Sequence, residues 1–172
     1  MRIDANDFEL FGLPLRYALS RAEIDTRWKA LQAQVHPDRF AAEGPAAQQI
    51  AMQWAVRVNE AHVRLKSPLA RAAYLCELHG ERPCEEGQTA GSADFLLQQV
   101  LWRESLEEAR DPEGLERLAS EVAAVRQSLY DALARAIDDR REWAVAADHV
   151  RSLMFVERFS RDIESRLDDS TA

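Results

Sequence analysis

The side chains best suited to a specific interaction stand together in the tripeptide His36-Pro37-Asp38. The residue before a proline is pushed out of the helical conformation, so a helix that reaches this point should end there. An imidazole and a carboxylate would then be exposed on one turn, where they can donate and accept hydrogen bonds. An ordinary structural role is also open, in which Asp38 caps a turn and His36 places a charge at a helix end.

Residue patterns for catalysis are missing from the sequence. It contains no GxGxxG, GxxxxGK[ST] or GxSxG segment to bind phosphate or an oxyanion. Adjacent carboxylates such as Glu107-Glu108 point about 100° apart on a helix, so we expect surface charge and no acid–base pair. The possible metal ligands are few and scattered: His36, His62, His79, His149, Cys76 and Cys84. We therefore expect no metal site, no cofactor and no enzymatic activity, and we expect the cysteines to be free thiols.

Charge is distributed unevenly along the 172 residues. The net charge is −8, but residues 1–66 carry +1 and residues 67–172 carry −9. Binding to nucleic acid needs a basic face, so we expect no nucleic-acid partner. Two modules with different partners would explain the asymmetry, although a solvated acidic face would explain it as well. No apolar run approaches the length of a membrane helix and the first ten residues do not form a signal peptide, so we expect a cytoplasmic protein without membrane contact.

Two antiparallel helices are predicted on either side of the tripeptide. The first begins at Ser20, which forms a capping-box pattern with Glu23, and it ends before Pro37. A loop over residues 36–44 follows, and Pro45 suits the first position of the second helix. Each helix has an apolar stripe at helical spacing: Ile24, Trp28, Leu31 and Val35 in the first, and Ile50, Trp54, Val58, Ala61 and Leu65 in the second.

The rest of the chain also shows helical periodicity, which predicts an all-α protein. Residues 79–92 interrupt it, with three glycines, a proline and no apolar period. We therefore expect an N-terminal domain over residues 1–76, a linker over 77–92 and a C-terminal domain over 93–172. Three helices with short connections predict an antiparallel three-helix bundle in the C-terminal domain. These helices span about residues 95–110, from residue 112 to beyond Ile137, and about 142–167.

The first helix of this bundle carries more apolar residues than one buried face needs. Phe95, Trp102 and Leu106 recur at spacings of seven and four, and they would bury the helix in its bundle. Beside this stripe lies a second apolar surface, which consists of Leu96, Leu97, Val100 and Leu101. The second surface could bind another protein, or it could pack against the N-terminal domain or the linker.

Several segments resemble the HscB family of J-domain co-chaperones. A helix, a His-Pro-Asp loop and an antiparallel helix with Asn59-Glu60-Ala61 are typical of a J domain. The likeness to HscB proteins rests on four segments in the same order: Phe8-Glu9-Leu10-Phe11-Gly12-Leu13-Pro14, Val35-His36-Pro37-Asp38-Arg39-Phe40, Ser67-Pro68-Leu69-Ala70-Arg71-Ala72-Ala73-Tyr74-Leu75 and Phe95-Leu96-Leu97. The resemblance covers nearly the whole chain.

This resemblance implies a protein that binds two partners and has no chemistry of its own. The J domain would dock on a DnaK-type chaperone of the HscA type and stimulate its ATPase, and the bundle would bind the iron–sulfur scaffold protein IscU. The chaperone-binding residues would be the tripeptide and three cations able to steer it toward an acidic surface: His36, Pro37, Asp38, Arg27, Lys29 and Arg39. Each cation alone could equally be a solvated side chain. The scaffold-binding residues, by matching position, would be Leu96, Leu97, Val100, Leu101, Arg103, Glu104, Glu108 and Phe155.

Two departures from the family and two alternative functions remain. Leu101 stands where a relative has an acidic residue, so apolar area would replace part of a salt-bridging contact. The pair of CxxC zinc motifs found in some eukaryotic relatives is absent from this sequence. One alternative is a J-domain protein that serves a general DnaK-type chaperone with many unfolded clients. The other is a helical module that dimerises through the Leu96–Leu101 surface.

Overall fold

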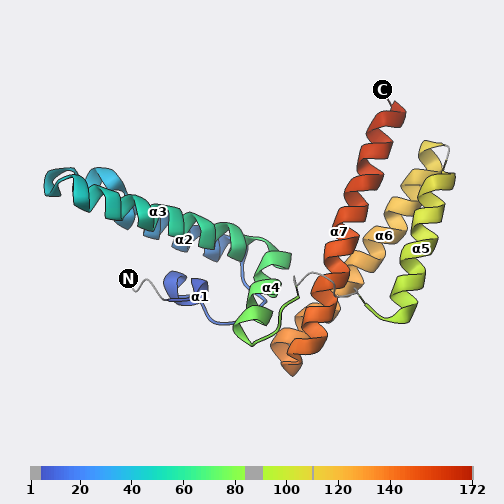
Figure 1. Cartoon of the computed structure of the whole chain (residues 1–172), viewed down its shortest axis with the longest axis horizontal. Helices are drawn as coiled ribbons and strands as arrows, with labels where there is room; N and C mark the ends of the chain where they lie inside the picture. Colours follow the sequence, from blue (N-terminus) through green and yellow to red (C-terminus); the bar gives the residue numbers. More distant parts are fainter. Residues whose placement is uncertain (1–4, 84–90, 110, 172) are drawn as a thin grey trace. The chain divides into compact units, whose positions relative to one another are not determined.

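The computed structural model describes residues 5–83, 91–109 and 111–171, and every regular element in these ranges is a helix (Figure 1). The all-α prediction is thereby confirmed. By contacts between Cα atoms, the chain divides into two compact units, Met1–Leu75 and Cys76–Ala172. Each unit is described by itself below.

The first unit is built on a long helical hairpin, α2 (Arg21–Val35) and α3 (Pro45–Lys66). Between them lies η1 (Pro37–Glu43), so the predicted loop is a stretch of 3₁₀-helix. The two long helices lie side by side over most of their length (Figure 1). Two shorter helices complete the unit: α1 (Asp7–Phe11), and α4 (Pro68–Leu78), whose last residues belong to the second unit.

One position in the predicted stripe of α3 is wrong. The side chain of Ile50 is 57% exposed, and Ala51 is buried in its place. The buried face follows a heptad in which Ala51, Val58 and Leu65 are seven residues apart. Ile50 points about 100° away from Ala51 around the helix, so it lies at the edge of this face.

The predicted capping box at Ser20 and Glu23 is also absent. Ser20 occupies the N-cap of α2 with extended backbone angles, but its side chain makes no capping hydrogen bond. A capping box forms instead at α1, where the Glu9 backbone N–H donates to Asn6 Oδ1 at 2.9 Å and the Asn6 N–H donates to Glu9 Oε2 at 3.2 Å. The short helix α1 is therefore fixed at its start by its own side chains.

A buried carboxylate ties α1 to α3. The side chain of Asp7 is fully buried and forms ion pairs with Arg57 at 2.6 Å and Arg64 at 2.8 Å. The ring of Tyr74, from α4, lies under the Arg64 guanidinium at 4.7 Å and stacks on Phe8 at 6.1 Å. Since a buried charge is costly without partners, these contacts set where α1 lies on the hairpin.

The second unit is an antiparallel bundle of α5 (Ala93–Glu108), α6 (Pro112–Ala134) and α7 (Trp143–Thr171). A turn of π-helix, η2 (Arg135–Arg140), extends α6 and ends at Arg141, whose φ of 56° reverses the chain. The three helices lie side by side in Figure 1. The core between them consists of Trp102, Leu118, Val122, Val156, Phe159 and Ile163.

The start of the predicted linker packs against this bundle. The ring of His79 stacks on that of Trp143, with 3.6 Å between centres, and Pro83 is buried. At the other end, the Gly91 N–H donates to the Asp148 carboxylate at 3.3 Å. Residues 84–90, with Cys84 and Gly87, lie outside the described residues. Cys76 is buried.

Candidate protein-binding sites

The His36-Pro37-Asp38 turn is exposed and is held by its own backbone. His36 ends α2 and also caps η1, with extended backbone angles of φ −64° and ψ 127°. Its Nδ1 accepts a hydrogen bond from the Asp38 backbone N–H at 3.3 Å, and its carbonyl accepts one from the Arg39 N–H at 3.1 Å. Because Nδ1 is the acceptor, Nε2 carries the ring proton and can donate to a partner.

The carboxylate of Asp38 has no structural task in this turn. Its side chain is 89% exposed, and that of His36 is 58% exposed. Asp38 Oδ2 lies 3.6 Å from His36 Nδ1, beyond hydrogen-bond distance, and caps no described backbone group. The proline imposes the turn, the imidazole stabilises it, and the carboxylate is left exposed to accept hydrogen bonds from another molecule.

The three predicted cations do not gather into one patch. Arg39 is next to the turn, and its guanidinium donates to the Ala33 carbonyl at 2.9 Å. Arg27 and Lys29 are exposed, but residues two apart on a helix point about 160° away from each other. They therefore lie on opposite sides of α2, and only Arg39 is tied to the turn.

Polar contacts between α2 and α3 position the turn, and sequence reasoning missed all but one of the residues involved. Asn59, part of the Asn59-Glu60-Ala61 segment, accepts hydrogen bonds from Trp28 Nε1 at 2.9 Å and from the Gln32 side chain. One turn along the hairpin, His62 Nε2 lies 2.7 Å from Asp25 Oδ1. The hydrogen bond to His62, followed by the one to Lys66, lowers the pKa of the Asp25 carboxyl below its usual value.

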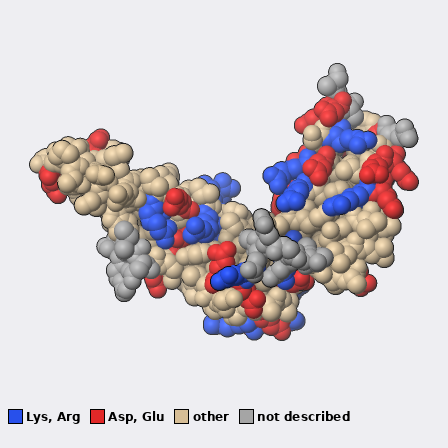
Figure 2. Space-filling model, viewed as in Figure 1, with Lys and Arg blue, Asp and Glu red and all other residues tan. Residues whose placement is uncertain are grey.

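In the second unit, α5 buries the predicted stripe and exposes its other side. Trp102 is fully buried, Phe95 and Leu106 pack against it, and the Trp102 Nε1–H donates to Glu121 at 2.8 Å. This hydrogen bond fixes the rotation of α5 on α6. The second surface is exposed: Leu96 by 37%, Leu97 by 60%, Val100 by 52% and Leu101 by 46%. Most of the surface over the N-terminal half of α5 is uncharged in Figure 2.

The exposed side of α5 carries two rows of residues. Spacings of four, three and four align Leu97 and Leu101 with Glu104 and Glu108, all of which are exposed. Spacings of four and three align Leu96, Val100 and Arg103 in a neighbouring row. An apolar strip that passes into charged residues is the pattern of a protein-binding surface with a polar rim.

Phe155, from α7, meets this second row. The Arg103 guanidinium lies over its ring, 5.7 Å from the centre. The ring itself is half-buried in an aromatic cluster with Phe95 at 6.0 Å, Trp102 at 6.5 Å and Phe159 at 5.8 Å. The structure thus brings together two predicted scaffold-binding residues that are 52 positions apart in sequence.

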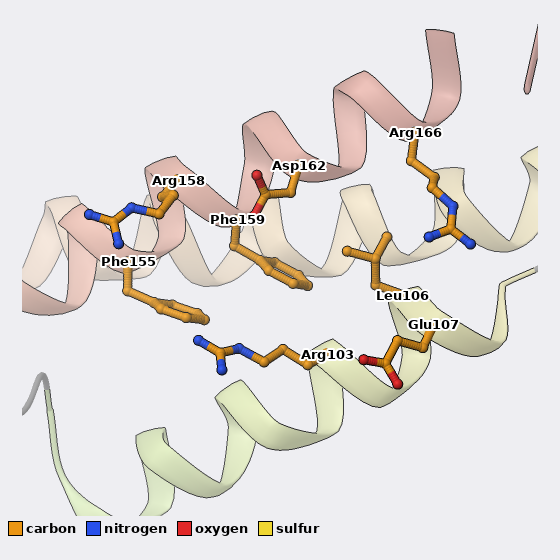
Figure 3. Close-up of a pocket in the computed structure, with 8 residues that line it drawn as sticks. All are labelled: Arg103, Leu106, Glu107, Phe155, Arg158, Phe159, Asp162 and Arg166. Atoms are coloured by element: carbon orange, nitrogen blue, oxygen red, sulfur yellow. The ribbon is translucent and has the colours of Figure 1, made fainter. Parts of the chain in front are cut away.

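A groove of about 250 Å³ lies between α5 and α7 beside Phe155 (Figure 3). Its lining residues are Arg103, Leu106, Glu107, Phe155, Arg158, Phe159, Asp162 and Arg166. Sequence reasoning selected Arg103 and Phe155 for binding and missed the others. The lining residues that belong to α7 recur at spacings of three, one, three and four, which places them on one face of the helix. This helical spacing was the signal in the sequence that could have revealed them.

In the described ranges, no group of three or more His, Cys, Asp or Glu residues is arranged to hold a metal ion. Within the same ranges, none of the helices combines the length and the apolar character needed to cross a membrane.

Comparisons with known proteins cover almost the whole chain. A family model described as the HSCB C-terminal oligomerisation domain matches residues 92–164. A co-chaperone protein HscB homolog of Bordetella petrii is 43% identical over 157 residues, which are 91% of this chain and 92% of the relative. One of Burkholderia mallei is 44% identical over 163 residues, 94% and 93% of the two chains.

Solved structures show the same architecture. The chaperone HscB from Vibrio cholerae superposes with a TM-score of 0.80 at 33% identity, covering 96% of this chain and 99% of that one. Human co-chaperone protein HscB has a TM-score of 0.88 at 22% identity, with coverage of 96% and 84%, and shows the shared fold.

A His-Pro-Asp turn on a helical hairpin, followed by a helical bundle, defines a J-domain co-chaperone with a C-terminal helical domain. The identities extend through both units at more than 40%. This chain belongs to the HscB family, the J-domain co-chaperones of iron–sulfur cluster assembly.

Proposed function

We propose that this protein binds an IscU-type scaffold through the exposed side of α5 and brings it to an HscA-type chaperone in the bacterial cytoplasm. The His36-Pro37-Asp38 turn engages the chaperone and stimulates its ATPase. The observation that carries this proposal is that one chain exposes two unlike binding features on separate units. One is a rigid polar turn and the other is an apolar helix face.

The turn is suited to recognise a charged surface. Its conformation is set by Pro37 and the hydrogen bond to His36 Nδ1, so little entropy is lost when a partner binds. The exposed Asp38 carboxylate can accept charge-assisted hydrogen bonds, and His36 Nε2 can donate one. A turn of this kind acts by contact with the ATPase and takes no part in covalent chemistry.

The α5 side is suited to bind a folded protein. Leu97 and Val100 are more than half exposed, although large apolar side chains gain free energy when buried. Arg103, Glu104 and Glu108 border the apolar strip with charge, which favours one register of docking. Leu101 extends the apolar strip, which supports a contact that depends more on buried area than on salt bridges.

The test is steady-state ATP turnover by the cognate HscA-type chaperone with the IscU-type scaffold present. The intact protein should stimulate turnover strongly, and His36→Gln and Asp38→Asn should abolish the stimulation. A matched control is Asp139→Asn, which removes an exposed carboxylate from the second unit and should stimulate normally. No stimulation by the intact protein would refute the proposal. If the protein stimulates a general DnaK-type chaperone as strongly as the HscA-type chaperone, it is a J-domain co-chaperone of a general chaperone.

Self-association is a second candidate for the α5 face, because the matching family model is described as an oligomerisation domain. In that case Leu96 and Leu97 would be buried against a second copy of the chain. Sedimentation at several concentrations separates the two uses. A dimer that becomes monomeric in the Leu96→Ala, Leu97→Ala double variant would assign the face to self-association. If the protein is a monomer at all concentrations, the α5 face is available to bind the scaffold.

A further inference from the structure

Three arginines line the groove between α5 and α7. Within the described residues, no carboxylate forms an ion pair or hydrogen bond with the guanidinium of Arg103, Arg158 or Arg166. Some other arginines of this unit are paired, as Arg117 is with Glu113 at 3.0 Å and Arg151 is with Asp148 at 3.3 Å. The groove therefore holds cations whose charge is available to a partner.

The surroundings make this concentration unusual. Residues 76–172 contain twelve arginines and twenty-two Asp and Glu residues, so the unit carries a net charge of −10. The groove, with three arginines against Glu107 and Asp162, carries +1. A local positive site attracts an acidic segment, whereas the net charge of −10 makes copies of the unit repel one another.

The floor of the groove is apolar. The rings of Phe155 and Phe159 lie nearly parallel, with 5.8 Å between centres, and Leu106 faces them from α5 (Figure 3). Phe155 and Leu106 are only half-buried, so the floor is open to a side chain from outside. An apolar floor edged by arginines fits a segment that carries both an apolar side chain and carboxylates.

We propose that this groove is a second part of the scaffold-binding surface and takes an acidic segment of the scaffold. An apolar side chain of that segment lies on Phe155 and Leu106, the open part of the floor, and its carboxylates pair with Arg158 and Arg166. The groove is continuous with the α5 surface, because Arg103 and Phe155 belong to both. This inference rests on the proposed function and adds residues of α7 and the chemistry of the partner to it.

The test is the affinity of the purified scaffold protein for the full chain, measured by calorimetry or fluorescence at several salt concentrations. The Arg158→Gln, Arg166→Gln double variant should bind about three- to tenfold more weakly at low salt. Its affinity should also depend less on salt than that of the unchanged protein, because the variant has lost exposed charge pairs. Arg158→Lys, Arg166→Lys should keep the salt dependence.

Arg161→Gln is the matched control, since Arg161 is an exposed arginine of α7 that does not line the groove. It should bind like the unchanged protein. If the double Gln variant binds like this control while Leu97→Ala weakens binding, the groove proposal is overturned and the proposed function stands. If the unchanged protein does not bind the scaffold, both are overturned. Self-association that the double Gln variant abolishes would assign the groove to a second copy of the chain and overturn the proposal.

Discussion

The guanidinium of Arg103 lies 5.7 Å above the centre of the Phe155 ring, joining α5 to α7 at the edge of the candidate scaffold-binding surface. A cation held over an aromatic face contributes about 0.5–1 kcal/mol at an exposed site. Arg103→Gln should therefore lower the free energy of unfolding by no more than about 1 kcal/mol, while weakening scaffold binding. Urea unfolding and a binding titration on the same samples check this. An unchanged affinity would remove Arg103 from the site.

Leu97 should matter for binding and hardly at all for folding, because its side chain is 60% exposed. Leu97→Ala should change the free energy of unfolding by less than about 0.5 kcal/mol, as expected for an exposed position. The same substitution should weaken scaffold binding about tenfold if the side chain is buried centrally in the complex. Val63→Ala is the control, since Val63 is a 69% exposed aliphatic residue on α3 and should change neither quantity.

Asp7 should be essential to the first unit although it lies far from the His36 turn in sequence. Asp7→Ala leaves Arg57 and Arg64 without their buried carboxylate and should cost about 3 kcal/mol of stability. Denaturant unfolding followed by circular dichroism measures the loss. Asp139→Ala, at an exposed position, should have almost no effect. Equal stability of the two variants would show that the ion pairs do not hold α1 in place.

His149 should make stability depend on pH. Burial lowers the pKa of its imidazole from the usual 6.5, with Arg135 lowering it further and Asp148 opposing the shift. Above that usual value the ring is neutral in both states and has no effect. As the pH falls from 6.5 through the lowered pKa, the unfolded chain binds a proton that the folded protein does not, so stability decreases. Urea midpoints between pH 5 and 8 should change less with pH in His149→Gln, and an identical pH dependence would contradict the assignment.

The hairpin and the bundle were predictable because their signals are local. The residue before Pro37 is disfavoured in the helical conformation and Pro45 suits a first helical position, so the position of the turn follows from covalent geometry. The two faces of α5 were likewise readable from spacing, since helical periodicity assigns side chains to sides without any knowledge of the partner helix. Periodicity alone places Leu97 and Trp102 on different sides of α5.

Sequence reasoning failed where two neighbouring residue patterns fitted the same structural role and only the packing of the helices determined which one filled it. Ile50 and Ala51 both continue an apolar stripe, and the register against α2 buried Ala51. Ser20-x-x-Glu23 and Asn6-x-x-Glu9 are both capping patterns, and only the second forms. The prediction that three cations flank the turn failed for another reason: Arg27 and Lys29 are close in sequence but lie on opposite sides of their helix.

The sequence by itself determined that the chain is helical, where the His36-Pro37-Asp38 turn lies and which side of α5 faces outward. Each of these depends on residues within a few turns of one another, so local conformation and periodicity are sufficient. Only the tertiary structure decided that Arg103 meets Phe155, that Asp7 pairs with Arg57 and Arg64, and that Arg158 and Arg166 share a groove with α5. Those residues are distant along the chain, and burial of the core sets the register that brings them together.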